Sequence, residues 1–284
     1  NMAAALKTHQ TADMIIFIPG FYGVSEHGEI TTFGRGGSDY SAAVVAASAK
    51  AQVLEIWKDT EGFMTADPDN IPHCRLIPAL TYEEAAELSY TGAGILHPRT
   101  VEPVRKAGIH IAIKNTDNPD APGSMIKARA NKAEQIVKSV SYTTDVAVLK
   151  IYASGVGARF GFLSQITENL ASSGINIKSV VTSQTCISIL LSKKDIEAGH
   201  ASIKKIRPTL FRKSSTVTDV ALVSIVGEGL QTHLGVAAKC FTAVSGANVN
   251  IEMISFGTSN AALYFLVHED KLDTTIHALH DMFF

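Results

Sequence analysis

The chain has 284 residues, of which 46% are hydrophobic and 18% are charged, so it is long enough for two or three domains with cores of their own. Its net charge of −2, and the lack of a Lys/Arg cluster interleaved with aromatic residues, argue against nucleic acid as a partner. No window reaches the roughly 18 apolar residues of a membrane-spanning helix, and the opening NMAAALKTHQTADM is not typical of a signal peptide. We therefore expect a cytoplasmic protein with no membrane partner.

The first 130 residues alternate between short apolar strands and helices, a pattern that predicts an α/β layer with largely parallel strands. Thr81 and Glu84 have the spacing of a capping box, and Pro98 suits the first turn of another helix. In chain order we predict a strand at 14–17, a helix at 39–50, a strand at 52–57, a helix after Thr81, a helix near Pro98 and a strand at 110–115.

Cysteine and histidine offer no obvious ligand set. Cys74, Cys186 and Cys240 are far apart and show neither CxxC nor Cys/His spacing, so we interpret them as small apolar fillers. The histidines show no ligand spacing either. The sequence therefore predicts no metal site built from these residues.

The second half contains an internal repeat, and each copy begins with the order strand, helix, strand, strand. Followed by a second helix and a fourth strand, this order is the ferredoxin-like pattern βαββαβ. Laid over each other, the copies place Gly161 beside Gly235 and Gly174 beside Gly246. The second copy ends after its second helix. We expect the apolar segment 134–142 to supply its fourth strand, which makes the first copy an insertion within the second.

Long motifs in the first half resemble a known family. The stretches GRGGSDYSAA, WKDTEGFMTADP and EEAAELSYTGAGILHPRTVEP are similar to the carboxyl-terminal lobe of aspartate kinases, and the remainder resembles their paired ACT regulatory domains. The resemblance implies an α/β fold class, with a partial amino-acid kinase lobe followed by two ferredoxin-like ACT domains. The implied domains are 1–130 for the lobe, 146–216 for the inserted first ACT domain, and 134–145 with 217–284 for the second.

The resemblance implies transfer of the γ-phosphoryl group of ATP, with Mg²⁺, to the side-chain carboxylate of L-aspartate, the first step towards lysine, threonine and methionine. Glycines let backbone N–H groups approach an anion, the following helix adds its positive end, and an arginine can clamp a carboxylate. The implied catalytic residues are Arg35, Ser38 and Asp39. The glycines of the anion cradle are Gly34, Gly36 and Gly37.

The loop WKDTEGFMTADP follows a strand, where open α/β sheets place ligands. The resemblance implies that Lys58 and Asp59 lie near the ribose or phosphates and that Phe63 and Met64 lie against adenine. Two departures remove cations from this site, because Asp69 stands where many relatives have arginine and Gly94 where many have lysine. We therefore expect weak ATP binding by this lobe alone.

The KFGG segment with which aspartate kinases normally begin does not occur, so we expect the amino-terminal lobe of the family to be missing and the chain to be inactive by itself. Two readings stay open. The chain is part of an aspartate kinase, or it is a non-catalytic regulatory subunit that binds an amino acid and acts on another chain.

The ACT resemblance implies an amino-acid site between the segment 156–163 of one domain and the segment 176–184 of a neighbour, formed mainly by backbone groups. Lysine-sensitive relatives tend to carry aspartate where this chain has Lys178, so we favour threonine over lysine as the effector. A homodimer through the ACT domains is expected. The candidate effector contacts are Gly161, Phe162, Leu163, Asn176, Ile177, Thr182, Ser183 and Gln184.

Overall fold

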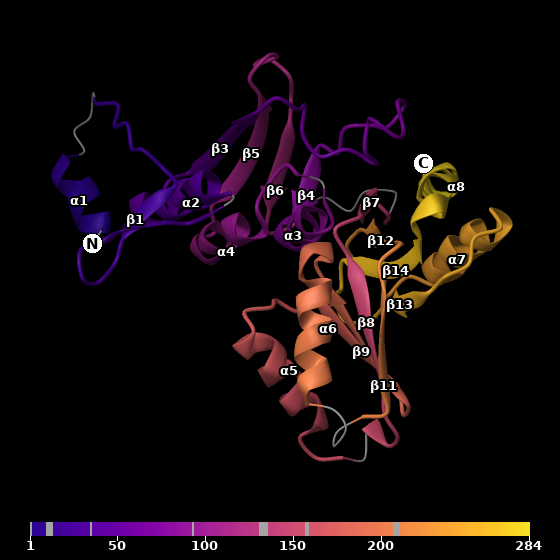
Figure 1. The fold of residues 1–284 in the computed structure, drawn as a ribbon. Coiled ribbons are helices and arrows are strands. Elements are labelled where there is room, and N and C mark those ends of the chain that lie inside the picture. The colour runs from indigo at the N-terminus through magenta and orange to yellow at the C-terminus, as the bar shows by residue number, and fades with distance from the viewer. Residues whose placement is uncertain are drawn as a thin grey trace.

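The computed structural model describes residues 2–9, 14–34, 36–92, 94–130, 136–156, 159–206 and 211–284. Three four-stranded sheets organise these residues, and a two-stranded hairpin precedes them. Figure 1 shows the kinase-like lobe at the top, the first ferredoxin-like unit below it and the second unit at the right. No helix in the described part of the chain is long and apolar enough to cross a membrane.

The sheet of the lobe has the order β3-β5-β6-β4, in which β3 and β5 are parallel, β4 and β6 are parallel, and β5 and β6 are antiparallel. The expectation of largely parallel strands is therefore correct for two of the three pairings. The elements of the lobe are α1 (Met2–His9), β1 (Tyr22–Val24), β2 (Ile30–Thr32), α2 (Gly37–Ala49), β3 (Val53–Lys58), β4 (Ala79–Thr81), α3 (Tyr82–Tyr90), α4 (Pro98–Ala107), β5 (His110–Asn115) and β6 (Ser124–Lys127).

Local sequence signals explain the ends of the helices in the lobe. Thr81 and Glu84 form the predicted capping box of α3, with each side chain accepting a hydrogen bond from the backbone N–H of the other residue. Pro98 occupies the first turn of α4, and Gly108 ends this helix in the left-handed conformation. Both helix predictions are confirmed.

The predicted strand at 14–17 is wrong. Residues 14–20 have no strand, and the side chains of Met14, Ile15 and Phe17 are 57%, 83% and 90% exposed. An apolar run becomes a strand only where a neighbour pairs with its backbone, and β1 and β2 pair with each other instead. The result is an apolar surface at this end of the lobe, open in the described part of the chain.

The first ferredoxin-like unit has the sheet order β11-β8-β10-β9, with every neighbouring pair antiparallel. Side chains of α5 and α6 pack on this sheet in one apolar core. The elements are β8 (Ala147–Tyr152), α5 (Phe162–Ser172), β9 (Ser179–Thr182), β10 (Cys186–Leu191), the 3-10 turn η2 (Lys193–Asp195), α6 (Ile196–Lys205) and β11 (Lys213–Val217).

The second unit has the sheet order β13-β14-β12-β7, and β7 pairs antiparallel with β12. Strand β7 lies within 134–145, upstream of the first unit, and takes the fourth place in this sheet. The elements are β7 (Ser139–Thr143), β12 (Val220–Val226), α7 (Val236–Gly246), β13 (Met253–Ser255), β14 (Ala262–His268), the 3-10 turn η3 (Glu269–Lys271) and α8 (Leu272–Phe283).

The internal repeat has a slightly different register from the predicted one. Gly161 and Gly235, both left-handed, begin α5 and α7 in the two units, as expected. At the other end Gly174 is left-handed, but its counterpart is Asn248, with φ of 60°, while Gly246 is still helical. Pairing Gly174 with Gly246 was therefore wrong by two residues, because asparagine also tolerates the left-handed conformation that ends a helix.

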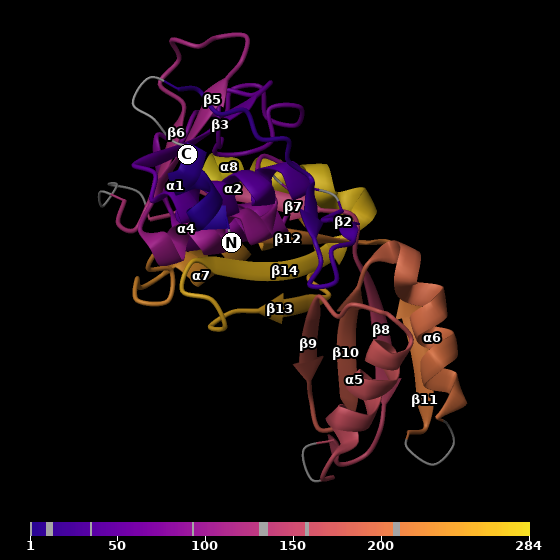
Figure 2. The same cartoon turned by 90° about the vertical axis from the view of Figure 1, so that its left-hand side faces the viewer.

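The second unit joins the other two parts. Its residues Val226 and Ala262 belong to the core of the lobe, and Leu222 and Leu266 pack with Val148 of the first unit. Figure 2 accordingly shows the β12–β14 sheet between the lobe above and the first unit below. The lobe and the two ferredoxin-like units are therefore connected by packed apolar contacts.

Candidate functional site

The glycine-rich loop meets the start of α2 as its composition suggests. Gly34 and Gly36 have left-handed φ angles of 76° and 73°, and Gly36 is the N-cap of α2. A Cβ on Gly36 would lie 2.5 Å from the Cβ of His97, so only glycine fits this approach of the loop to α4. Arg35, the predicted carboxylate clamp, lies outside the described residues.

A half-buried ion pair beside this loop brings two predicted site residues together. Lys58 Nζ, at the end of β3, lies 3.1 Å and 3.4 Å from the two carboxylate oxygens of Asp39 in the first turn of α2. Their side chains are 29% and 18% exposed. The pair places an ammonium group beside the positive end of α2, where an anionic ligand is favoured. Ser38 is exposed in the same turn, and Gly37 is buried.

A cavity of about 340 Å³ opens beside the glycine loop. Its wall includes Gly36 and Gly37, together with Tyr40, His97 and Arg99, which bring aromatic and cationic groups to the loop. His97 caps α4 by accepting a hydrogen bond from the N–H of Arg99 at 3.2 Å, so its role in this structure is to begin the helix. The sequence analysis missed Tyr40 and Arg99, because nothing local to them signals a site.

A cavity of about 690 Å³ lies between the loop that follows β3 and strand β7. Asp59, Phe63 and Met64 line it as a group, whereas Lys58 is not among its lining residues. Phe63 is fully buried and also belongs to the core of the lobe. The remaining lining residues are Thr60, Glu61, Gly62, Ala66, Asp67, Pro68, Asp69, Leu88, Gly92, Ile95, Ser139, Val140, Ser141, Tyr142, Thr143 and Thr144.

This cavity is acidic. Four carboxylates, those of Asp59, Glu61, Asp67 and Asp69, are among its lining residues, and within the described chain no lysine, arginine or histidine lines it. Gly94 is not among its lining residues. Carboxylate oxygens repel bare phosphates but are the ligands that a hard cation such as Mg²⁺ prefers. The charge of the cavity therefore suits a hard cation better than a bare anion.

Tyr142 of β7 connects this cavity to the second unit. Its hydroxyl contacts Asp67 Oδ2 at 3.2 Å and Asn70 Oδ1 at 2.7 Å. Burial, followed by the nearby Asp67 carboxylate, raises the pKa of Tyr142 to about 12, so the hydroxyl stays protonated and donates. The sequence analysis treated 134–142 only as a missing strand and gave no sign that it forms a cavity wall.

Helix α3 is the second junction between the lobe and the two ferredoxin-like units. Both carboxylate oxygens of Glu87 are bound, one by the hydroxyl of Tyr264 and one by that of Ser259 in the second unit. One turn on, the Tyr90 hydroxyl donates to the carbonyl of Lys178 in the first unit at 3.1 Å. Burial, with Glu87 as the second cause, raises the pKa of both tyrosines. A cavity of about 330 Å³ lies among these groups.

The predicted effector residues do not all meet within one chain. Gly161 begins α5 at the carboxyl end of β8, and Gln184 lies beside that end, where its carbonyl accepts from the Val156 N–H at 3.2 Å. Phe162 is buried as the first turn of α5, and Leu163 is 41% exposed. Thr182 and Ser183 are exposed beside Gln184.

Asn176 and Ile177 lie before the start of β9, at the opposite end of the strand from Thr182. Strand β9 therefore separates Asn176 and Ile177 from Thr182 and Ser183 along the chain. Lys178 forms an ion pair with Asp145, with 3.0 Å between its ammonium nitrogen and Asp145 Oδ2, and its side chain is only 20% exposed. Burial would raise the pKa of Asp145, but hydrogen bonds from Ser192 and Lys178 outweigh it, and the net pKa is lowered.

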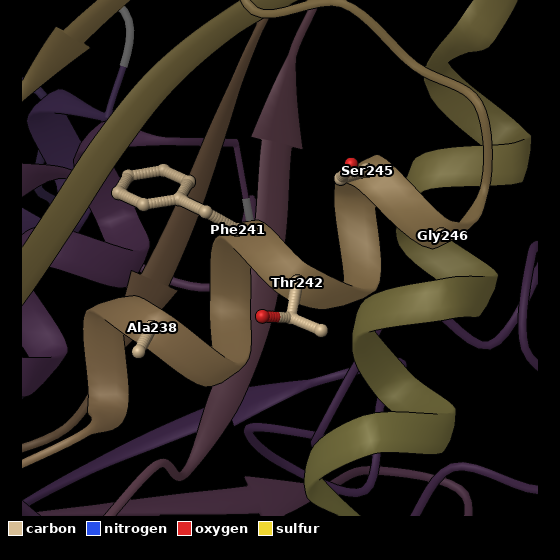
Figure 3. A pocket seen from close by; sticks show the side chains of 5 residues that line it. All are labelled: Ala238, Phe241, Thr242, Ser245 and Gly246. Carbon is tan, nitrogen blue, oxygen red and sulfur yellow. The ribbon is translucent and has the colours of Figure 1, made fainter.

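A shallow depression of about 580 Å³ on the outer face of α7 has no comparable chemistry. Figure 3 shows its lining side chains along one helix, and none of them is charged. The lining residues are Ala238, Phe241, Thr242, Ser245 and Gly246. We therefore assign no ligand to it.

Comparison with known proteins agrees with this architecture. Residues 1–115 match the amino acid kinase family, and residues 223–283 match an ACT domain. The chain is 33% identical over 279 residues to a bifunctional aspartokinase/homoserine dehydrogenase of Haemophilus influenzae, covering 96% of this chain and 34% of that protein. Across its curated relatives the chain spans from about a third to about two thirds of their length.

Solved structures give the same result. An aspartate kinase of Clostridium acetobutylicum superposes with a TM-score of 0.84 at 30% identity, covering 94% of this chain and 62% of that one. E. coli aspartokinase III superposes in a complex with aspartate and ADP (TM-score 0.80) and in a complex with lysine and aspartate (TM-score 0.76). Each of these two superpositions has 26% identity and covers 93% of this chain and 59% of that one. The chain belongs to the aspartokinase family, with amino acid kinase and ACT segments.

Proposed function

We propose that this chain provides the nucleotide-side part of an aspartate kinase, together with the regulatory domains that control it. The reaction is transfer of the γ-phosphoryl group of ATP to the side-chain carboxylate of L-aspartate, which gives 4-phospho-L-aspartate. The observation that carries the proposal is the Asp39–Lys58 pair, because it joins the glycine cradle to the loop after β3. The complexes of E. coli aspartokinase III with aspartate and ADP support the same assignment.

The proposed roles follow from charge and position. Ser38 and Arg35 bind substrate aspartate, and Lys58, held by Asp39, faces the transferring phosphoryl group. Fixed donors of this kind lower the repulsion between two anionic reactants. Gly34, Gly36 and Gly37 offer backbone N–H groups to the anion.

The acidic cavity takes the nucleotide in this proposal, with Met64 and Phe63 against the base. Mg²⁺ fits the donors that are present, because Asp59, Asp67 and Asp69 offer the carboxylate oxygens that this ion prefers. When bound, the ion neutralises phosphate charge, which the lining residues themselves do not do.

The regulatory part of the proposal is a homodimer of ACT domains that binds an amino acid between Gly161–Leu163 of one copy and 176–184 of the other. Lysine is bound by E. coli aspartokinase III. We propose threonine for this chain, because Lys178 places a cation where a lysine effector would put its own. Its pairing with Asp145 reduces that repulsion but leaves no anion free for the effector. We also propose the cytoplasm as location, together with the domain limits 1–130, 146–216, and 134–145 with 217–284.

The first test is calorimetric titration of the purified chain with magnesium ATP, threonine and lysine in turn. Wild type is expected to bind magnesium ATP, and Lys58→Met to bind it at least about tenfold more weakly, since one fixed cation is lost. Lys106→Met is the matched control, because this lysine is exposed and paired only with Glu102 on the surface of α4. Equal affinity of wild type and both variants for magnesium ATP would show that Lys58 does not contribute to the binding site.

A second candidate function, a regulatory subunit without catalysis, is favoured by the lining of the 690 Å³ cavity, where the described residues supply four carboxylates and no lysine, arginine or histidine. It predicts that threonine or lysine binds while magnesium ATP does not. The proposed kinase predicts phosphotransfer once the apolar surface at 14–33 is covered by a further lobe. An assay that traps acyl phosphate with hydroxylamine separates the two.

A further inference from the structure

Two segments of the chain, separated by about 200 residues in sequence, bring three metal-ligating side chains together. His73 lies in the loop between β3 and β4, and His280 and Asp281 lie in the last turn of α8. One ligand atom from each of the three lies within 4.8 Å of the other two. The two imidazole rings meet edge to face, with centroids 5.2 Å apart.

His280 is held in the manner of a metal ligand. Its side chain is 2% exposed, its ring stacks on Phe284 with centroids 4.9 Å apart, and its Nε2 lies 3.0 Å from the hydroxyl of Thr65. Histidines that bind a metal through one ring nitrogen usually donate the other N–H to an oxygen, which fixes the ring. Thr65 provides this oxygen, and its position is set by a hydrogen bond that it accepts from the Arg75 N–H.

The groups that would bind the metal are free to do so. Within the described part of the chain Nδ1 of His280 has no hydrogen bond and Asp281 has no ion pair. His73 and Asp281 are exposed, so their side chains can rotate. Ligand atoms around a tetrahedral Zn²⁺ lie about 3.3 Å apart, so the three ligand atoms need to approach one another by up to about 1.5 Å.

We propose that His73, His280 and Asp281 form a binding site for a divalent cation of the zinc type. Two imidazoles with one carboxylate favour Zn²⁺, Co²⁺ or Ni²⁺ over Mg²⁺ and Ca²⁺, which prefer an all-oxygen set. The site is therefore distinct in chemistry from the one that serves the nucleotide. Because Thr65 belongs to the loop that lines the 690 Å³ cavity, a bound ion fastens α8 of the second unit to that loop.

The experiment uses the full chain, purified without a histidine tag and freed of metal with EDTA. Titration with Zn²⁺ by calorimetry is expected to give one equivalent bound, and Co²⁺ is expected to give the visible absorption of a tetrahedral site. His73→Ala and Asp281→Asn are expected to weaken binding at least about tenfold each. Both replace exposed side chains, so the fold is retained.

The matched control is His277→Ala, an exposed histidine one turn earlier in α8 that lies outside the cluster. Its affinity for Zn²⁺ is expected to equal that of wild type. Thr65→Val, which keeps the shape but removes the oxygen beside His280, is expected to weaken binding about 10-fold to 100-fold. Zn²⁺ should also raise the thermal midpoint of wild type but not of His73→Ala.

Three results would overturn the site. The first is that no Zn²⁺ binds. The second is that binding persists unchanged in His73→Ala and Asp281→Asn, which would indicate adventitious contacts elsewhere. The third is that binding is lost in His277→Ala while His73→Ala retains it.

Discussion

The buried carboxylate of Glu84 is one of the contacts between the lobe and the second ferredoxin-like unit. Its side chain is fully buried in the first turn of α3. One oxygen accepts from the Thr81 N–H at 2.8 Å and from the Lys138 ammonium at 2.7 Å, and the other accepts from the Glu228 N–H at 2.8 Å. Three segments far apart in sequence therefore converge on one charge.

Glu84→Gln keeps the volume of the side chain but removes the charge and leaves the Lys138 ammonium, 11% exposed, without its partner. Breaking a buried pair by removing one partner costs about 3 to 5 kcal/mol. We expect the lower part of this range, about 3 kcal/mol, because Lys138 retains some contact with water and with the carbonyl of Ala79. In domains of this size each kcal/mol lowers the thermal midpoint by about 2 to 4 °C, so a fall of roughly 6 to 12 °C is expected.

The assay is thermal and urea unfolding of wild type, Glu84→Gln and Glu83→Gln. Glu83 is the neighbouring residue, but it is 45% exposed and paired with Arg105 at the surface, so its replacement should cost less than about 1 kcal/mol. Joint replacement Glu84→Leu with Lys138→Met should cost less than the sum of the two single changes, because neither charge is then left alone. Equal stability of Glu84→Gln and Glu83→Gln would refute the reasoning.

Three further predictions follow from single residues. Gly36→Ala should destabilise the chain more than Gly34→Ala, because both have left-handed φ angles but only Gly36 would bring a Cβ against His97; equal thermal midpoints would contradict this. The pKa of Asp145 is lowered, because hydrogen bonds to its carboxylate outweigh the effect of burial. The ionised carboxylate therefore stabilises the folded state above a pH of about 4, and this contribution is lost as the pH falls through the folded-state pKa. The difference in unfolding free energy between wild type and Asp145→Asn should accordingly shrink from pH 7 to pH 3, and a constant difference would argue against the pairing. Cys240 is fully buried, and burial raises the pKa of its thiol to about 12, so iodoacetamide at pH 8 should modify it only after unfolding, as mass spectrometry would detect.

Much of the architecture was predictable because its signals are local or periodic. The capping box of Thr81 and Glu84, the helix start at Pro98 and the equivalence of Gly161 and Gly235 in the repeat each depend on a few neighbouring residues, and all three are present in the structure. Polar and small residues at such points satisfy backbone groups wherever the chain later folds. Either glycine or asparagine can adopt the left-handed conformation that ends a helix. The second copy uses Asn248 for this purpose, so the prediction of Gly246 was wrong by two positions.

The candidate site was predictable only in its parts. The glycine loop, Asp39 and the loop after β3 were each identified from the sequence. The ion pair between Asp39 and Lys58, which connects them, depends on how α2 packs beside β3. Tyr142 and Glu87 were missed, since their partners lie in another domain.

The sequence by itself determined the helices and strands of the two ferredoxin-like units and their order. The periodicity of hydrophobic residues, the helix-capping residues and the internal repeat can all be identified from neighbouring positions in the chain. Only the tertiary structure decided which charges and ligands meet across domains. Glu84 meets Lys138, and His73 meets His280, at separations over which no local pattern operates. Such contacts form only once apolar faces have docked, and that docking determines which polar groups are left facing one another in the low-dielectric space between domains.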